Sequence, residues 1–253
     1  MSLKTILNYS PNFSSKKRSS KQIKFIIFHY TGMKSESAAI KRLINTKSEV
    51  SSHYLIKKNG EINSLVPDLY IAWHAGISSW KGIKSLNKYS IGIEITNPGH
   101  INNYKKFSKK QINSILKLTK FLIKKYKIQP QNILGHSDIA PYRKIDPGIS
   151  FPWLLLEQKK LAFEIKKINM KHLNKFLIKK WYKKYNFSKK KILLFMLSFI
   201  GYDVRIAYKN KSNLDKIIYA YTSRFKHYNK NKKNIFYIVE VHFFNILLTK
   251  LKK

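Results

Sequence analysis

Cysteine is absent from this chain of 253 residues, so neither a disulfide bond nor a thiolate nucleophile or metal ligand is available. Acidic residues are scarce: 12 Asp and Glu stand against 51 Lys and Arg, which gives a formal net charge of +39. Such an excess favours polyanionic partners. The basic residues are nevertheless spread along the whole chain, and no nucleic-acid reader motif accompanies them. We therefore expect no specific binding of nucleic acid.

Long hydrophobic runs are also missing. The longest apolar stretch, residues 192–200, is far shorter than the ~20 residues that span a bilayer. The first 20 residues are polar and basic, without the apolar core of a secretory signal. We expect a monomeric protein without a transmembrane segment and a cytoplasmic location, with a periplasmic or cell-envelope location left open.

Hydrophobic residues still make up 43% of the chain, which is enough for a buried core. Residues 25–30 form a continuous apolar run, as in a strand covered on both faces. Residues 90–96 alternate strictly, with isoleucines on one face and Gly92 and Glu94 on the other. Asn59-Gly60 is typical of a tight hairpin turn.

Helix signals lie between these strands. Ser35 can cap one helix, and residues 107–112 contain a capping box that opens a second helix, which must end before Pro130. Residues 133–136 return as a strand. Because strands and helices alternate, the sequence predicts an α/β fold with a mixed central sheet flanked by helices.

The pattern becomes helical and rich in lysine beyond Trp153. A helix is expected over residues 154–167, and three amphipathic helices are expected later, the first beginning at Ser188 and ending at Gly201. The sequence therefore predicts three parts, namely an α/β domain over residues 20–155, a helical basic connector over 156–185, and a small three-helix domain over 186–253.

Reactive side chains gather in three segments of the α/β domain. His29 closes the first apolar run, Glu94 stands on an otherwise apolar strand, and residues 135–148 contain His136, Lys144 and Asp146. Two imidazoles and one carboxylate form a ligand set for Zn²⁺ that leaves one coordination position for water. A further Glu and Lys nearby would supply proton transfer and oxyanion stabilisation. This combination outlines a zinc hydrolase.

Six short motifs occur in one order over about 120 residues. They are His29-Tyr30-Thr31, Ser52-His53-Tyr54, Trp73-His74-Ala75-Gly76, Ile93-Glu94, Gly135-His136 and Arg143-Lys144-Ile145-Asp146-Pro147-Gly148. Together they resemble the zinc-dependent N-acetylmuramoyl-L-alanine amidases of the AmpD/AmiD type, which are related to peptidoglycan recognition proteins. The resemblance implies a mixed sheet with a zinc groove. Gly201-Tyr202-Asp203 and residues 220–225 resemble a diverged peptidoglycan-binding three-helix domain.

The resemblance also assigns roles to individual residues. It makes His29, His136 and Asp146 the Zn²⁺ ligands, Glu94 the catalytic base and Lys144 the second catalytic residue. Each of these positions has an ordinary alternative. Asp146 could merely start a turn, and Glu94 could pair with a surface lysine.

Three more residues are expected to bind substrate. The resemblance places Tyr30, Tyr54 and His74 along the groove, although His74 could equally be a histidine packed beside Trp73. The implied reaction is hydrolysis of the amide between the lactyl group of N-acetylmuramic or anhydro-muramic acid and L-alanine of the stem peptide. The implied partner is peptidoglycan or a muropeptide. The alternative is a non-catalytic peptidoglycan-binding protein of the same fold.

Overall fold

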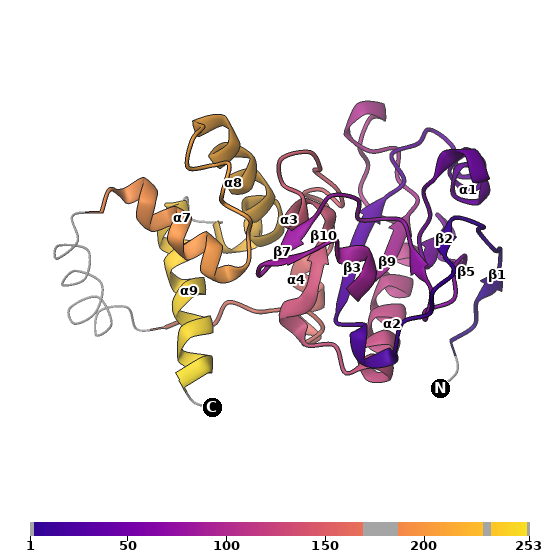
Figure 1. Cartoon of the computed structure of the whole chain (residues 1–253), viewed down its shortest axis with the longest axis horizontal. Coiled ribbons are helices and arrows are strands. Elements are labelled where there is room, and N and C mark those ends of the chain that lie inside the picture. The colour runs from indigo at the N-terminus through magenta and orange to yellow at the C-terminus, as the bar shows by residue number, and fades with distance from the viewer. Residues whose placement is uncertain (1–2, 169–186, 230–233, 252–253) are drawn as a thin grey trace.

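A six-stranded mixed sheet forms the centre of the computed structural model, which describes residues 3–168, 187–229 and 234–251 (Figure 1). The strand order is β1-β5-β4-β9-β3-β10, and β2-β6 and β7-β8 form two small antiparallel pairs. The strands are β1 Ile6–Leu7, β2 Phe13–Ser14, β3 Phe25–Tyr30, β4 Tyr54–Ile56, β5 Ile62–Ser64, β6 Ile71–Ala72, β7 Ser79–Trp80, β8 Ile83–Lys84, β9 Ser90–Ile95 and β10 Ile133–Gly135.

Helices cover the sheet and form the C-terminal part of the molecule. They are α1 Glu36–Ile44, α2 Lys109–Tyr126, α3 His136–Ile139, α4 Trp153–Gln158, α7 Lys189–Ile200, α8 Lys211–Phe225 and α9 Ile235–Leu251. The predicted α/β fold with a mixed central sheet is confirmed. Each helix in the described part of the chain is too short or too polar to span a bilayer.

Several helix ends lie where the sequence predicts them. The Ser35 side chain accepts a hydrogen bond from the backbone N–H of Ala38 at the start of α1. Ser108 and Gln111 form the expected capping box of α2. Ser188 caps α7, and Gly201 with φ 143° ends it. These ends are predictable because each depends on side chains within a few residues of the helix terminus.

Two boundaries differ from the expectation. His136 is not the last residue of a strand but the first of α3, because the Asp138 carboxylate accepts a hydrogen bond from the N–H of Gly135 at 2.8 Å and turns the chain into a helix. The helix expected over 154–167 is α4 alone, which ends at Gln158. The predicted connector over 156–185 is described only to residue 168, and its remainder lies outside the described residues.

Three adjacent parallel strands place the reactive residues. Phe28 pairs with Gly135 of β10, and His29 pairs with Glu94 of β9. Since His136 follows Gly135 directly, His136, His29 and Glu94 form a row across the ends of the three strands. The alternate strand residues point to the other face, where Ile26, Phe28 and the isoleucines of β9 pack against α2.

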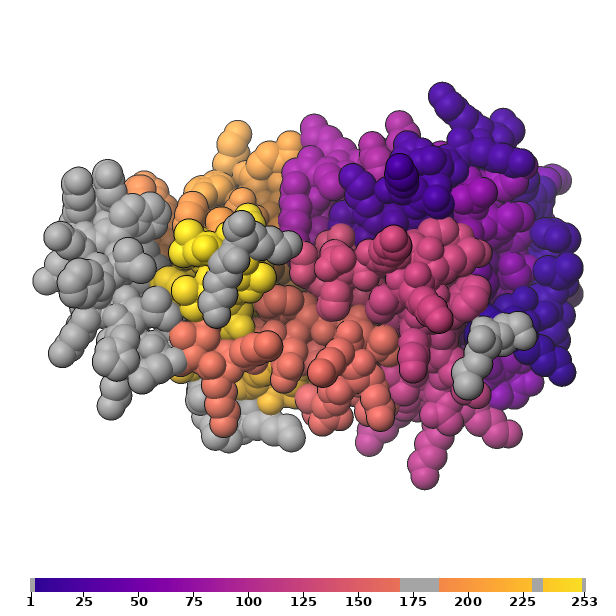
Figure 2. Space-filling model, turned by 90° about the horizontal axis from the view of Figure 1, so that it is seen from below, coloured from indigo at the N-terminus to yellow at the C-terminus, as the bar shows by residue number. Residues whose placement is uncertain are grey.

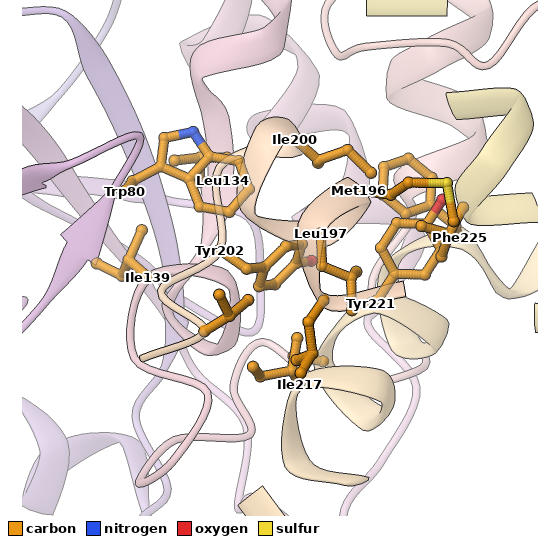
Figure 3. Packing of buried hydrophobic residues seen from close by; sticks show 14 of the residues in the cluster. Trp80, Leu134, Ile139, Met196, Leu197, Ile200, Tyr202, Ile217, Tyr221 and Phe225 are labelled. Carbon is orange, nitrogen blue, oxygen red and sulfur yellow. The ribbon is translucent and has the colours of Figure 1, made fainter. Parts of the chain in front are cut away.

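The other face of the sheet shares its core with the C-terminal helices. Trp80, Leu134 and Ile139 from the α/β part interleave with apolar side chains of α7 and α8 (Figure 3). Figure 2 shows the C-terminal helices in direct contact with the α/β part. The helices expected within residues 186–253 are therefore present, and they pack as a continuation of the sheet's core.

A buried polar cluster joins the two parts beneath α3. Arg224 of α8 donates to Asp138 Oδ2 at 2.7 Å and to the carbonyl of Ile133 at 2.8 Å. Tyr202 donates to Asp138 Oδ1 at 2.6 Å. Arg224 is 4% exposed and Asp138 is 1% exposed. The cluster lies two residues from His136, so it connects the C-terminal helices to the turn that holds this histidine.

Replacing Arg224 by Ala should leave the Asp138 carboxylate buried without its cation. We expect the free energy of unfolding, measured by urea denaturation, to fall by about 3–5 kcal/mol. The control is Arg205→Ala, which breaks the exposed pair with Asp203 and should leave the unfolding midpoint unchanged. Equal effects of the two substitutions would contradict a structural role for the buried cluster.

Candidate metal centre

Three ligand atoms converge where β3 ends and α3 begins. His29 Nδ1 lies 2.9 Å from His136 Nδ1, and Asp146 Oδ2 lies 3.2 and 3.1 Å from these two atoms. The loop that contains Asp146 is tied to α3, because the Ser137 N–H donates to the Asp146 carbonyl at 2.8 Å. All three ligand residues are buried. The predicted ligand set is thus brought to one point by residues far apart in the sequence.

Hydrogen bonds to the far ring nitrogens fix which atoms can bind a cation. His136 Nε2 donates to the carbonyl of Ala75 at 3.1 Å, and His29 Nε2 lies 3.0 Å from His74 Nδ1. When both Nε2 atoms carry protons, both Nδ1 atoms direct lone pairs toward each other and toward Asp146. Three electron-pair donors at such separations repel one another unless a cation lies among them. Four-coordinate zinc sets neighbouring ligand atoms about 3.3 Å apart, so the residues fit a metal ion.

Burial and charge set the protonation of the ligands. Burial, together with the neighbouring His136, lowers the pKa of His29 to about 4, so this ring is neutral at pH 7. Burial alone would raise the pKa of Asp146, but His136 and His29 hold it well below its usual range. A neutral imidazole beside a carboxylate is the state that a metal ion requires.

Glu94 stands beside this cluster on the same face of the sheet. Its Oε2 atom is buried and receives no hydrogen bond from the described residues. Burial, and then the charge of Asp146, raise the pKa of Glu94 to about 8, while Lys144 acts in the opposite direction. Glu94 is therefore a carboxyl group that gains or loses its proton near neutral pH.

The three ligand residues and Glu94 line one cleft of about 740 Å³. Lys144 lines the cleft with the three ligands and Glu94, as does Tyr30 at the end of β3. The Tyr30 hydroxyl lies 3.0 Å from His100 Nδ1, and burial raises the pKa of Tyr30 to about 12. Tyr30 therefore presents a neutral phenol to the cleft. His100 contacts the site through this bond.

Tyr54 does not line the cleft, which corrects the expectation for this residue. On β4, Tyr54 pairs with Ile93 and shares its face of the sheet, opposite to that of His29 and Glu94. Its hydroxyl donates to Asp68 Oδ1 at 2.7 Å, and the side chain is buried. The tyrosine is part of the core beneath α2.

His74 lines the cleft but lies behind His29. Its Nε2 atom is 3.1 Å from Ser90 Oγ, and its ring is largely buried. Burial, and then the neighbouring His29, lower the pKa of His74 well below its usual value. The structure therefore places His74 in contact with His29. The sequence had suggested either substrate binding or packing beside Trp73, and neither describes this contact.

Two contacts of the site involve atoms that sequence reasoning did not identify. The Ala75 carbonyl accepts from His136, and the Asn87 side chain holds the backbone of the same segment by accepting from the N–H groups of His74 and Ala75. In the sequence, these contacts could have been suspected only from the position of His74 and Ala75 within the Trp73–Gly76 motif. Backbone acceptors leave no signature of their own in residue identity.

Comparison with known proteins gives relatives of one kind. A family model described as N-acetylmuramoyl-L-alanine amidase matches residues 19–149. The amidase AmiD of Escherichia coli (strain K12) is 41% identical over 150 residues, which cover 54% of this chain and 53% of that protein. The 1,6-anhydro-N-acetylmuramyl-L-alanine amidase AmpD of Haemophilus influenzae is 43% identical over 105 residues, which cover 41% and 55%. The chain thus spans about half the length of these relatives.

Solved structures match over more of the chain. The crystal structure of AMPDH3 from Pseudomonas aeruginosa has a TM-score of 0.73 at 25% identity and covers 92% of this chain and 94% of that one. E. coli AmiD, in complex with anhydro-N-acetylmuramic acid-L-Ala-D-gamma-Glu-L-Lys, has a TM-score of 0.70 at 30% identity and covers 90% and 91%. Coverage of this extent includes C-terminal helices. The geometry of the site and these matches agree, and the chain belongs to the N-acetylmuramoyl-L-alanine amidase family.

Proposed function

We propose that the protein is a zinc-dependent N-acetylmuramoyl-L-alanine amidase. Its reaction is hydrolysis of the amide between the lactyl group of N-acetylmuramic or anhydro-muramic acid and L-alanine of the stem peptide. The observation that carries the proposal is the convergence of His29, His136 and Asp146 beside Glu94 in one cleft. Family membership supports the same reaction.

Zn²⁺ is the metal that best suits this donor set. Two imidazole nitrogens and one carboxylate oxygen are the ligands of many catalytic zinc sites, in which a fourth position stays open. When bound, Zn²⁺ supplies Lewis acidity toward a carbonyl oxygen and lowers the pKa of water. His29, His136 and Asp146 would hold the ion.

Glu94 is suited to move the proton in this reaction. Its Oε2 atom, which has no hydrogen-bond partner in the described part of the chain, can accept a proton from the attacking water and deliver it to the departing nitrogen of L-alanine. A pKa of about 8 keeps the two protonation states close in free energy near neutral pH, and a cation at the ligand cluster would favour the ionised state. Proton acceptance and proton return are then both accessible to one side chain.

Lys144 supplies positive charge to the same cleft. Its positive charge lowers the pKa of Glu94, although burial and Asp146 outweigh this effect. An ammonium group in this position stabilises the negative charge that develops on the carbonyl oxygen during attack. Tyr30, held by His100, presents a hydroxyl at the end of β3 that can orient a polar substrate group.

A muropeptide is the proposed substrate class. The cleft of about 740 Å³ is large enough for a sugar with the first residues of a peptide, and its lining offers both charged and apolar side chains. Two matched structures were solved with compounds of this class, AmiD with the anhydro-muramyl tripeptide and AMPDH3 with anhydromuramic pentapeptide.

Glu94→Gln should remove most of the activity because glutamine cannot accept the proton. With anhydro-N-acetylmuramic acid-L-Ala-D-gamma-Glu-L-Lys as substrate, we expect kcat/KM to fall about 10²–10⁴-fold. The matched control is Tyr54→Phe, which lies on the opposite face of the sheet and should keep activity within about threefold of wild type. Released tripeptide is measured by mass spectrometry.

The same assay tests the metal. Chelator should abolish release of the tripeptide, and added Zn²⁺ should restore it. Turnover that persists in chelator, or wild-type rates in Glu94→Gln, would exclude the proposed amidase. Stoichiometric binding of the compound without any release would instead identify a peptidoglycan-binding protein.

The raised pKa of Glu94 also predicts how stability depends on pH. Because the folded pKa of about 8 exceeds the ordinary value of 4.5, the folded protein holds the proton more tightly. The contribution of this group to stability is therefore present below pH 4.5 and is lost as the pH rises to 8.

Glu94→Gln should remove the loss of stability that accompanies ionisation of Glu94, because glutamine stays uncharged at every pH. In chelator at pH 8, we expect the variant to exceed wild type in free energy of unfolding by about 4 kcal/mol, and the difference should vanish below pH 4.5. Urea denaturation across this pH range provides the measurement. A difference that does not change with pH would refute the buried, protonated state of Glu94.

A further inference from the structure

A chain of hydrogen bonds extends behind His29, away from the cleft. His29 Nε2 lies 3.0 Å from His74 Nδ1, and His74 Nε2 lies 3.1 Å from Ser90 Oγ. Ser90 Oγ donates in turn to the carbonyl of Leu86 at 2.7 Å. The chain thus begins at a ligand side chain and ends on a backbone acceptor.

The backbone acceptor fixes the direction of every bond in this chain. A carbonyl oxygen can only accept, so the Ser90 hydroxyl must spend its one proton on Leu86. Ser90 Oγ then accepts from His74 Nε2, which leaves a lone pair on His74 Nδ1. This lone pair accepts from His29 Nε2, and the lone pair of His29 is thereby held on Nδ1, the atom that faces His136 and Asp146.

The backbone of β9 is shaped to admit the His74 ring. A Cβ atom on Gly92 would lie 2.4 Å from His74 Cγ and 2.6 Å from His74 Nδ1. Real Cβ contacts do not reach such distances, so only glycine allows the ring to lie against the strand. The Asn87 side chain fixes the other end of the arrangement, since its Oδ1 accepts from the His74 N–H at 3.1 Å and from the Ala75 N–H at 2.7 Å.

The segment His74-Ala75 also contacts His136, the second histidine ligand. The Ala75 carbonyl accepts from His136 Nε2 at 3.1 Å. The side chain of residue 74 therefore faces one ligand and the carbonyl of residue 75 faces the other. Partners of this kind fix the ring orientation and the tautomer of a ligating histidine.

We propose that His74 is a positioning residue for the metal, which holds His29 in the Nε2-protonated tautomer with Nδ1 aimed at the ligand cluster. The role depends on the placement of His74 by Gly92 and Asn87. It rests on the proposed function in that the cluster binds a metal ion. It differs from substrate binding because the contacts of His74 are with His29 and Ser90.

The test is the affinity of the full chain for Zn²⁺, measured by competition with a chromogenic chelator. His74→Phe fills the space of the ring without an acceptor and should weaken Zn²⁺ binding about 10–100-fold. His74→Asn keeps an acceptor bonded to Cγ and should restore affinity to within about threefold of wild type. A merely structural role would not distinguish the two variants in this way.

A second pair of variants tests the same contact without removing the imidazole. Gly92→Ala should displace the His74 ring and also weaken Zn²⁺ binding about 10–100-fold. In a His74→Ala background the space is free, so adding Gly92→Ala should change affinity by less than about threefold. Additive losses would show that Gly92 acts on the site by another route and would overturn the proposal.

Nitrogen chemical shifts of the metal-free protein provide a readout that does not depend on the metal. His29 should show the Nε2-protonated tautomer in wild type and a mixture of tautomers in His74→Phe. Zn²⁺ affinity and His29 tautomer that are both unchanged in His74→Phe would refute the positioning role. Failure of the wild-type protein to bind Zn²⁺ would instead refute the proposed function, so the two failures are distinguishable.

Discussion

The parallel strands β10, β3 and β9 are held in a register that brings Phe28 beside Gly135 and His29 beside Glu94. Side chains alternate along a strand, so a slip of β3 by one residue would turn His29 into the packed face beneath α2. Such a slip is opposed because it would bury the imidazole of His29 among the apolar side chains that surround Ile26 and Phe28. The ligand cluster, Glu94 and the cleft all depend on this register.

The site concentrates groups that oppose folding in the absence of a cation. Two imidazole lone pairs and a carboxylate point at one another, and Glu94 is held beside them with a raised pKa. Binding of a cation would relieve both effects, so the free energy of this repulsion would add to the affinity of the cluster for a metal ion. The hydrogen bond from His29 Nε2 to His74, at 3.0 Å, opposes rotation of the His29 ring away from the cluster.

Most of the fold was predictable from local signals. Helix caps at Ser108 and Ser188 and the alternation of β9 depend on neighbours in sequence, and the ordered motifs placed the ligands and Glu94 in one cleft. Tyr54 was placed wrongly because the order of motifs does not state which face of a strand a side chain occupies. α4 ends early in a local turn, in which Lys160 takes φ 57° and the N–H of Leu161 donates to the carbonyl of Leu156, and no glycine or proline marks that turn in the sequence. The contacts of His74 depend on residues that only the tertiary fold brings near, so no local pattern could predict them.

The core shared by the α/β part and α7 and α8 has a consequence for how such proteins can change in evolution. The apolar faces of these helices are completed by Trp80, Leu134 and Ile139, and Arg224 ends on a carboxylate of the other part. If α7 and α8 were fused to an unrelated protein, their apolar faces would be exposed to water, because the surface formed by Trp80, Leu134 and Ile139 would be missing. A premature stop codon before α8 would bare that surface and leave the carboxylate of Asp138 without its cation, two positions from His136.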